Sequence, residues 1–70
     1  MTLEKVRKVV KDNLGIMHYF RFKGARNQIE EFRGMITNVY PSIFIIKIDN
    51  TTIRSFSYSD LLIDNLEIIS

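Results

Sequence analysis

Apolar and polar residues at the start of the chain alternate with the period of a helix. The apolar positions recur at spacings of three and four residues, at Leu3, Val6, Val10 and Leu14. This spacing places them on one face of a helix. Thr2 can cap the first turn, and Gly15 can end the last one in a left-handed conformation. The sequence therefore predicts an amphipathic helix over residues 2–14, with basic side chains away from the apolar stripe.

After Gly15 the period changes from helical to alternating, as in a strand with one buried face. Over residues 16–23, one face carries Ile16, His18, Phe20 and Phe22. The opposite face carries Met17, Tyr19, Arg21 and Lys23. Further apolar segments predict strands at residues 29–40, 43–48, 53–56 and 62–69. Residues 24–27 read as a turn, and residues 57–60 as a single capped turn of helix.

The long second strand is interrupted by a glycine and ended by a proline. Gly34 lies in its interior, where glycine weakens a flat strand and usually marks a bulge or a sharp bend. We therefore expect a strong bend or bulge at Gly34. Pro41 ends the strand because it has no N–H to donate to a sheet.

One helix followed by five short strands predicts a mainly β protein. A small sheet avoids exposed edges by curling until its ends meet, and the bend at Gly34 favours such curling. A helical turn between the fourth and fifth strands is typical of SH3-like barrels. The sequence therefore predicts a five-stranded SH3-like or Sm-like barrel with one N-terminal helix. With 70 residues, we expect a single domain: the helix in residues 1–14 and the barrel in residues 15–70.

The residue types of the chain do not favour a catalytic site or a metal site. The chain has no cysteine and one histidine, so the usual zinc ligand sets are out of reach. His18 shares the apolar face of its predicted strand, which indicates a core histidine. Glu30 and Glu31 are adjacent on a strand and face opposite sides, which argues against paired acid–base work. We expect no catalytic, metal-binding or cofactor-binding residues, and the chain is not predicted to be an enzyme.

Hydropathy bears on location. The longest apolar run covers residues 43–46, whereas a membrane-spanning helix needs about 20 residues. Charges at Glu4, Lys5, Arg7 and Lys8 interrupt the region where a secretory signal would be apolar. We therefore expect a cytoplasmic protein with no membrane partner.

The charge is unevenly distributed. Residues 1–33 carry eight lysines or arginines and four acidic residues, whereas residues 34–70 carry two and four. Basic groups interleaved with an aromatic ring can follow a phosphate backbone and stack a base. The candidate contacts for nucleic acid or a protein partner are Lys5, Lys8, Lys11, Tyr19, Arg21, Lys23 and Arg26. An ordinary solvated surface stays the competing interpretation.

Two tyrosines fall at predicted strand ends. Tyr40 and Tyr58 could anchor a partner from the rim of the barrel. Alternatively, each ring could pack over the barrel end with its hydroxyl bonded to the backbone. Both interpretations stay open from sequence.

Four short segments have a distinctive order and spacing. They are Asn13-Leu14-Gly15, Gly34-Met35-Ile36, residues 40–46 beginning Tyr40-Pro41-Ser42, and residues 57–62 beginning Ser57-Tyr58-Ser59-Asp60. Over residues 14–68 the chain resembles the Veg family of short proteins from Gram-positive bacteria. The resemblance implies a small cytoplasmic regulator linked to the control of biofilm genes, with no enzymatic activity.

Two functional classes follow from these observations. The first is a non-catalytic regulator of gene expression that acts through a protein partner. The second is a nucleic-acid-binding barrel that uses the basic surface of the helix and first strand. Fold analogy with Sm-like proteins supports the second class only as analogy. Self-association is a further expectation, because edge strands and the helix stripe both invite burial.

Overall fold

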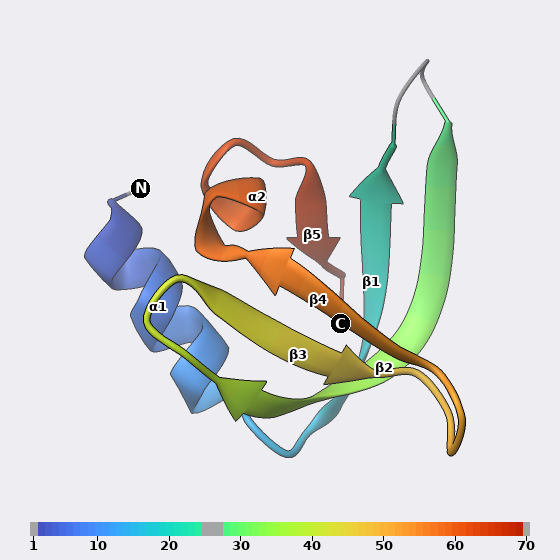
Figure 1. The fold of residues 1–70 in the computed structure, drawn as a ribbon. Coiled ribbons are helices and arrows are strands. Elements are labelled where there is room, and N and C mark those ends of the chain that lie inside the picture. Colours follow the sequence, from blue (N-terminus) through green and yellow to red (C-terminus); the bar gives the residue numbers. More distant parts are fainter. Residues whose placement is uncertain (1, 25–27, 70) are drawn as a thin grey trace.

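A computed structural model describes residues 2–24 and 28–69. Within them the chain forms α1 (Leu3–Asp12), β1 (Met17–Lys23), β2 (Ile29–Val39), β3 (Ile43–Lys47), β4 (Ile53–Ser57), α2 (Tyr58–Leu62) and β5 (Leu66–Ile68) (Figure 1). The predicted element order is confirmed. Most of the predicted turn at residues 24–27 lies outside the described residues.

The five strands form one antiparallel sheet in the order β4-β3-β2-β1-β5. This confirms the mainly β prediction. The sheet is strongly curved (Figure 1), but β4 and β5 at its two edges do not pair with each other. Instead, α2 connects these edges and contacts both strands. Within the described residues the sheet therefore does not close into the predicted barrel, because α2, and not a β4–β5 pairing, joins its two edges.

The strand β2 belongs to both halves of the sheet. It pairs with β1 through Met35 and with β3 from Met35 onward, so Met35 faces both Met17 and Lys47. The register shifts between Ile36 and Asn38. A bulge inserts one extra residue into a strand. As a result Ile36 and Val39, three residues apart, both contribute to the core.

Of the bend or bulge predicted at Gly34, the bulge lies elsewhere in β2. The pairing of Gly34 with His18 is regular, and the register shifts two residues later, after Ile36. A Cβ atom at Gly34 would lie 2.6 Å from Cγ2 of Ile46 and 3.2 Å from the backbone oxygen of Lys47. Glycine is needed here because β3 approaches the Gly34 backbone closely. The absence of a side chain lets β2 curve around the core.

Among the described residues, nine buried side chains form the core, contributed by α1, all five strands and α2. They are Val6, Val10, Phe20, Ile36, Phe44, Ile46, Phe56, Tyr58 and Leu66. Only the middle of the predicted helix stripe enters this core, since Leu3 and Leu14 are 41% and 43% exposed. The helix ends at Asp12, and Leu14 instead forms an isolated bridge with Ile36.

The predicted N-cap is present, since the Thr2 side chain accepts a hydrogen bond from the backbone N–H of Lys5. The predicted stop at Gly15 is not the cap, because α1 ends at Asp12 with Asn13 as its C-cap, and Gly15, with a φ of +80°, lies in the turn that follows. Ser57 and Asp60 form a reciprocal capping box that starts α2, as is typical of helix N-termini. The predicted fifth strand is shortened to Leu66–Ile68 because α2 continues to Leu62 and the chain then turns at Asp64, with a φ of +61°.

A charged side chain covers part of the inner face. Arg54 lies opposite buried Ile46 in the β3–β4 pairing. Its guanidinium carbon lies 5.1–5.4 Å from the ring centres of Phe22, Phe32 and Phe56, and its Nη1 lies 2.7 Å from Glu30 Oε2. Arg54 therefore combines contacts to aromatic faces with an ion pair at the open side of the sheet.

His18 lies half-buried on the core side of β1, as its position in the alternation predicted. Its ring meets Phe20 edge to face at 6.3 Å. Neither ring nitrogen has a hydrogen-bond partner among the described residues. No helix in the part of the chain that the structure describes has the length and apolar character needed to cross a membrane.

Candidate partner-binding groove

The residues predicted from sequence fall on two separate surfaces. Tyr19, Arg21 and Lys23 lie on the outer face of β1. Lys5, Lys8 and Lys11 lie on α1. Arg26, the last basic candidate, lies outside the described residues. The two surfaces differ in how their charges are compensated, and that difference separates the candidate functions.

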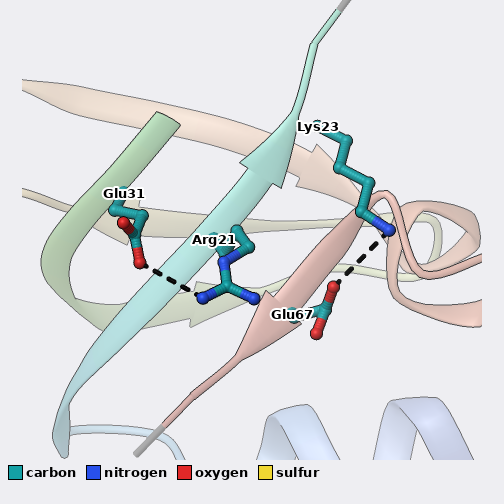
Figure 2. Close-up of polar contacts among 4 residues, drawn as sticks. All are labelled: Arg21, Lys23, Glu31 and Glu67. Carbon is teal, nitrogen blue, oxygen red and sulfur yellow. Dashed lines mark hydrogen bonds and ion pairs between the residues drawn. The ribbon is translucent and has the colours of Figure 1, made fainter. Parts of the chain in front are cut away.

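On β1, the basic side chains lie beside carboxylates. Figure 2 shows Arg21 and Lys23 with Glu31 of β2 and Glu67 of β5. Arg21 Nη2 lies 3.4 Å from Glu31 Oε2, and Lys23 Nζ lies 3.8 Å from Glu67 Oε1. These exposed pairs add little stability. They do compensate the charges of Arg21 and Lys23, which makes these two residues less suited to contact phosphates.

Tyr19 is the exposed aromatic residue of the same face, with 52% of its surface accessible. Its cross-strand neighbour Arg33 places a guanidinium 5.9 Å from the ring centre. A ring that already carries an arginine over one face has less surface left for stacking a base. Arg33 was not among the predicted contacts because its position beside Tyr19 depends on the β1–β2 register.

A groove of about 320 Å³ is lined by four of the remaining candidates, Lys8, Lys11, Tyr40 and Tyr58. Its lining comes from α1, the end of β2, the β2–β3 turn and the first residue of α2, and comprises Arg7, Lys8, Lys11, Val39, Tyr40, Pro41 and Tyr58. Figure 1 shows α1 beside α2 and the β2–β3 turn. The fold therefore brings Lys8 and Lys11 together with Tyr40 and Tyr58. Lys5 lies outside this lining.

Tyr58 forms a fixed wall of the groove. Its side chain is buried, with 5% exposed, and its hydroxyl donates a 2.6 Å hydrogen bond to the backbone carbonyl of Tyr40. Arg7 Nη2 donates a 2.7 Å bond to the carbonyl of Pro41, and the Arg7 guanidinium lies 5.5 Å from the Tyr58 ring centre. These contacts join α1, the β2–β3 turn and α2 into one framework.

The two tyrosines follow different alternatives of the sequence analysis. Tyr58 packs over the end of the core with its hydroxyl bonded to the backbone. Tyr40 is 50% exposed at the mouth of the groove. An amphipathic ring in such a position is suited to contact a partner.

The basic side chains of the groove form no ion pair with another described residue. No carboxylate among the described residues is part of its lining, although Glu4 and Asp12 lie one helical turn on either side of Lys8 on α1. Within the described ranges 2–24 and 28–69, no ion pair involves a residue of α1. Lys8 and Lys11 are both exposed. The groove is therefore suited to bind an anionic group beside an apolar one.

Sequence reasoning did not place Arg7, Val39 and Pro41 in the site. Arg7 is one helical turn before Lys11, so the two side chains share a flank of α1. That spacing could have predicted that Arg7 lies in the same site as Lys11. Which flank faces the β2–β3 turn depends on how α1 docks, and helix docking has no local signature in the chain.

The sequence model of the family described as biofilm formation stimulator VEG matches residues 1–69 of the chain. The matched range includes every residue that lines the groove. No curated protein matches the chain.

Proposed function

Because this chain belongs to the VEG family of biofilm formation stimulators, we propose that it acts as a non-catalytic cytoplasmic regulator of gene expression. In this proposal it stimulates biofilm formation by binding a protein partner in the groove between α1 and the β2–β3 turn. The family description supports the link to biofilm formation. The groove supports the mode of action.

The single observation that carries the proposal is the contrast between the two basic surfaces. On β1, Arg21 and Lys23 lie beside Glu31 and Glu67. In the groove, the lysines of α1 lie beside exposed Tyr40 with no carboxylate in the lining. A fixed apolar surface with a few convergent polar groups is the usual form of a binding site. This favours the groove over the β1 face.

The basic surface of α1 is short, which favours binding to a protein partner over binding to a long nucleic-acid strand. The basic surface of α1 does not continue onto β1 as uncompensated charge. Binding to single strands relies on a positively charged groove that follows the backbone together with successive stacking rings. One exposed tyrosine beside a short cluster of cations is better suited to a peptide segment.

The proposal is tested in a strain that lacks this chain and produces less biofilm. The strain is complemented with the wild-type chain, with a groove variant (Lys8→Gln, Lys11→Gln, Tyr40→Ala) or with a control variant (Arg21→Gln, Lys23→Gln). We expect the groove variant to restore neither biofilm mass nor transcription of biofilm genes. The control should restore both, because it carries equal loss of basic charge on the other surface.

Immunoblots and thermal unfolding establish that each variant is folded and equally abundant. A groove variant that is folded, abundant and fully active would overturn the proposal. A photo-crosslinking residue at Tyr40 adds a direct readout. We expect a protein adduct that persists after nuclease treatment, and an adduct that nuclease abolishes would instead favour nucleic acid.

A further inference from the structure

We infer that the occupant of the groove is an acidic peptide segment in which carboxylates alternate with a large apolar side chain. This inference rests on the proposed function and specifies the chemistry of the partner. It follows from the spacing of the cations on α1, the donors that Arg7 retains, and the fixed apolar surface around Tyr40.

Lys8 and Lys11 set the spacing of the carboxylates. They are three residues apart on α1, so their Cβ atoms are about 5–6 Å apart on one flank of the helix. In an extended peptide, alternate residues lie about 6.6 Å apart and point to the same side. Carboxylates at alternate positions of such a peptide would therefore meet the two lysines, which are flexible enough to absorb the small difference.

Arg7 provides a pre-organised anion contact. One of its terminal nitrogens donates to the carbonyl of Pro41, and its guanidinium packs over Tyr58. A guanidinium has five N–H donors in a planar fork, so donors remain after this bond. Because the contacts with Pro41 and Tyr58 already hold the side chain, little rotamer freedom is lost when a carboxylate binds.

The apolar side chain of the peptide would rest on Tyr40, Val39 and Pro41. The Tyr40 backbone is held on both sides: its N–H donates to the carbonyl of Ile43 at 2.8 Å, and its carbonyl accepts from Tyr58. The ring nevertheless stays half-exposed. A fixed backbone under an exposed ring gives a binding surface that does not have to order itself on contact.

The inference is tested by fluorescence anisotropy with a labelled peptide of about 12 residues, in which glutamate alternates with leucine and phenylalanine. A matched peptide carries glutamine in place of every glutamate. A labelled oligothymidylate of similar charge represents nucleic acid. We expect the acidic peptide to bind, the glutamine peptide to bind at least about tenfold more weakly, and raised salt to weaken the acidic complex.

Two variants locate the binding. Lys8→Gln with Lys11→Gln should raise the Kd of the acidic peptide by about tenfold or more, because charge-assisted contacts are lost. Lys5→Gln removes a charge from the same helix outside the lining and should change Kd by less than about twofold. Equal binding of the two peptides, equal effects of the two variants, or tighter binding of oligothymidylate would each overturn the inference.

A second copy of the chain is the other occupant to examine. The loop after α2 presents Ile63, 62% exposed, beside Asp64. Sedimentation of the free protein distinguishes this case. A dimer that is lost both in Lys8→Gln/Lys11→Gln and in Ile63→Ser would show that the groove takes a second copy, which would overturn the inference.

The peptide and biofilm experiments fail in distinguishable ways. If the acidic peptide does not bind but the groove variant loses biofilm stimulation, the proposed function stands and the acidic chemistry of the partner is wrong. If the peptide binds and the groove variant still stimulates biofilm, the groove has the inferred chemistry but the proposed function is wrong.

Discussion

The hydroxyl of Tyr58 donates a 2.6 Å hydrogen bond to the backbone carbonyl of Tyr40, a residue 18 positions earlier in the chain. The bond joins the start of α2 to the end of β2. It lies at the back of the groove, where the Tyr58 ring also contacts Phe44 of the core and the guanidinium of Arg7. One side chain therefore couples the groove to the hydrophobic core.

Removing this hydroxyl alone should weaken the fold. Tyr58→Phe keeps the buried ring but leaves the Tyr40 carbonyl without its partner, so we expect the free energy of unfolding to fall by about 0.5–1.5 kcal/mol. Urea denaturation measures the change. Tyr40→Phe is the matched control, because the Tyr40 hydroxyl has no hydrogen-bond partner within the described residues. Equal stabilities of the two variants would contradict the structural role of the bond.

Gly34 should not tolerate a methyl group. In Gly34→Ala the new Cβ would collide with Cγ2 of buried Ile46 and crowd the backbone of Lys47, which is expected to cost about 1–3 kcal/mol. Gly24→Ala is the control, since a Cβ there would meet only the Gln28 carbonyl oxygen at 3.6 Å. Thermal unfolding compares the two, and a Gly34→Ala protein as stable as the control would show that β3 can move away.

Arg54 should stabilise the sheet more through aromatic contacts than through its charge. Arg54→Lys keeps the positive charge but loses the planar contacts with three phenylalanine rings, so we expect a loss of about 0.5–2 kcal/mol. Glu30→Gln removes the ion pair at a side chain that is 56% exposed, which should cost less than about 1 kcal/mol. Chemical denaturation of both variants and of their combination measures each contribution. A larger loss in Glu30→Gln would reverse this order.

The turn between β3 and β4 should respond to acid. Hydrogen bonds from the backbone and hydroxyl of Thr51, followed by the backbone of Thr52, lower the pKa of the Asp49 carboxyl below its ordinary value of 3.8. A group with a lowered pKa in the folded state stabilises the protein above its unfolded pKa. That contribution is lost as the pH falls through the folded value.

We therefore expect Asp49→Ala to have a lower Tm than the wild type at about pH 7, and the difference to shrink as the pH falls below the ordinary pKa of 3.8. Asp49→Asn can still accept hydrogen bonds from the turn but carries no charge, so its deficit at about pH 7 should be smaller than that of Asp49→Ala and should also shrink as the pH falls. Melting curves from about pH 7 to about pH 2 measure both. A deficit in Asp49→Ala that stays constant over this range would show that charge has no part in the turn.

Local interactions determined what the sequence could predict. Thr2 marks the start of the first helix because an N-cap acts within a few residues, whereas the observed end at Asp12 lies three residues before the predicted stop at Gly15. The alternation in β1 correctly placed Phe20 inside and Arg21 outside, since neighbouring residues of a strand face opposite sides. The serine and aspartate of the capping box were likewise recognisable from their spacing of three.

Tertiary packing decided the rest. The bulge after Ile36, the partners of Arg21 and the place of Arg54 among aromatic rings depend on strand register, which is set by how distant segments fill a common core. The groove depends on the docking of α1 against the β2–β3 turn, which brings together Lys8 and Tyr40, 32 positions apart in the sequence. The sequence determined which elements form and which of their faces are apolar, because those preferences arise within a few residues. Only the folded chain determined which charges are compensated and where a partner can bind, because those contacts join residues far apart in the sequence.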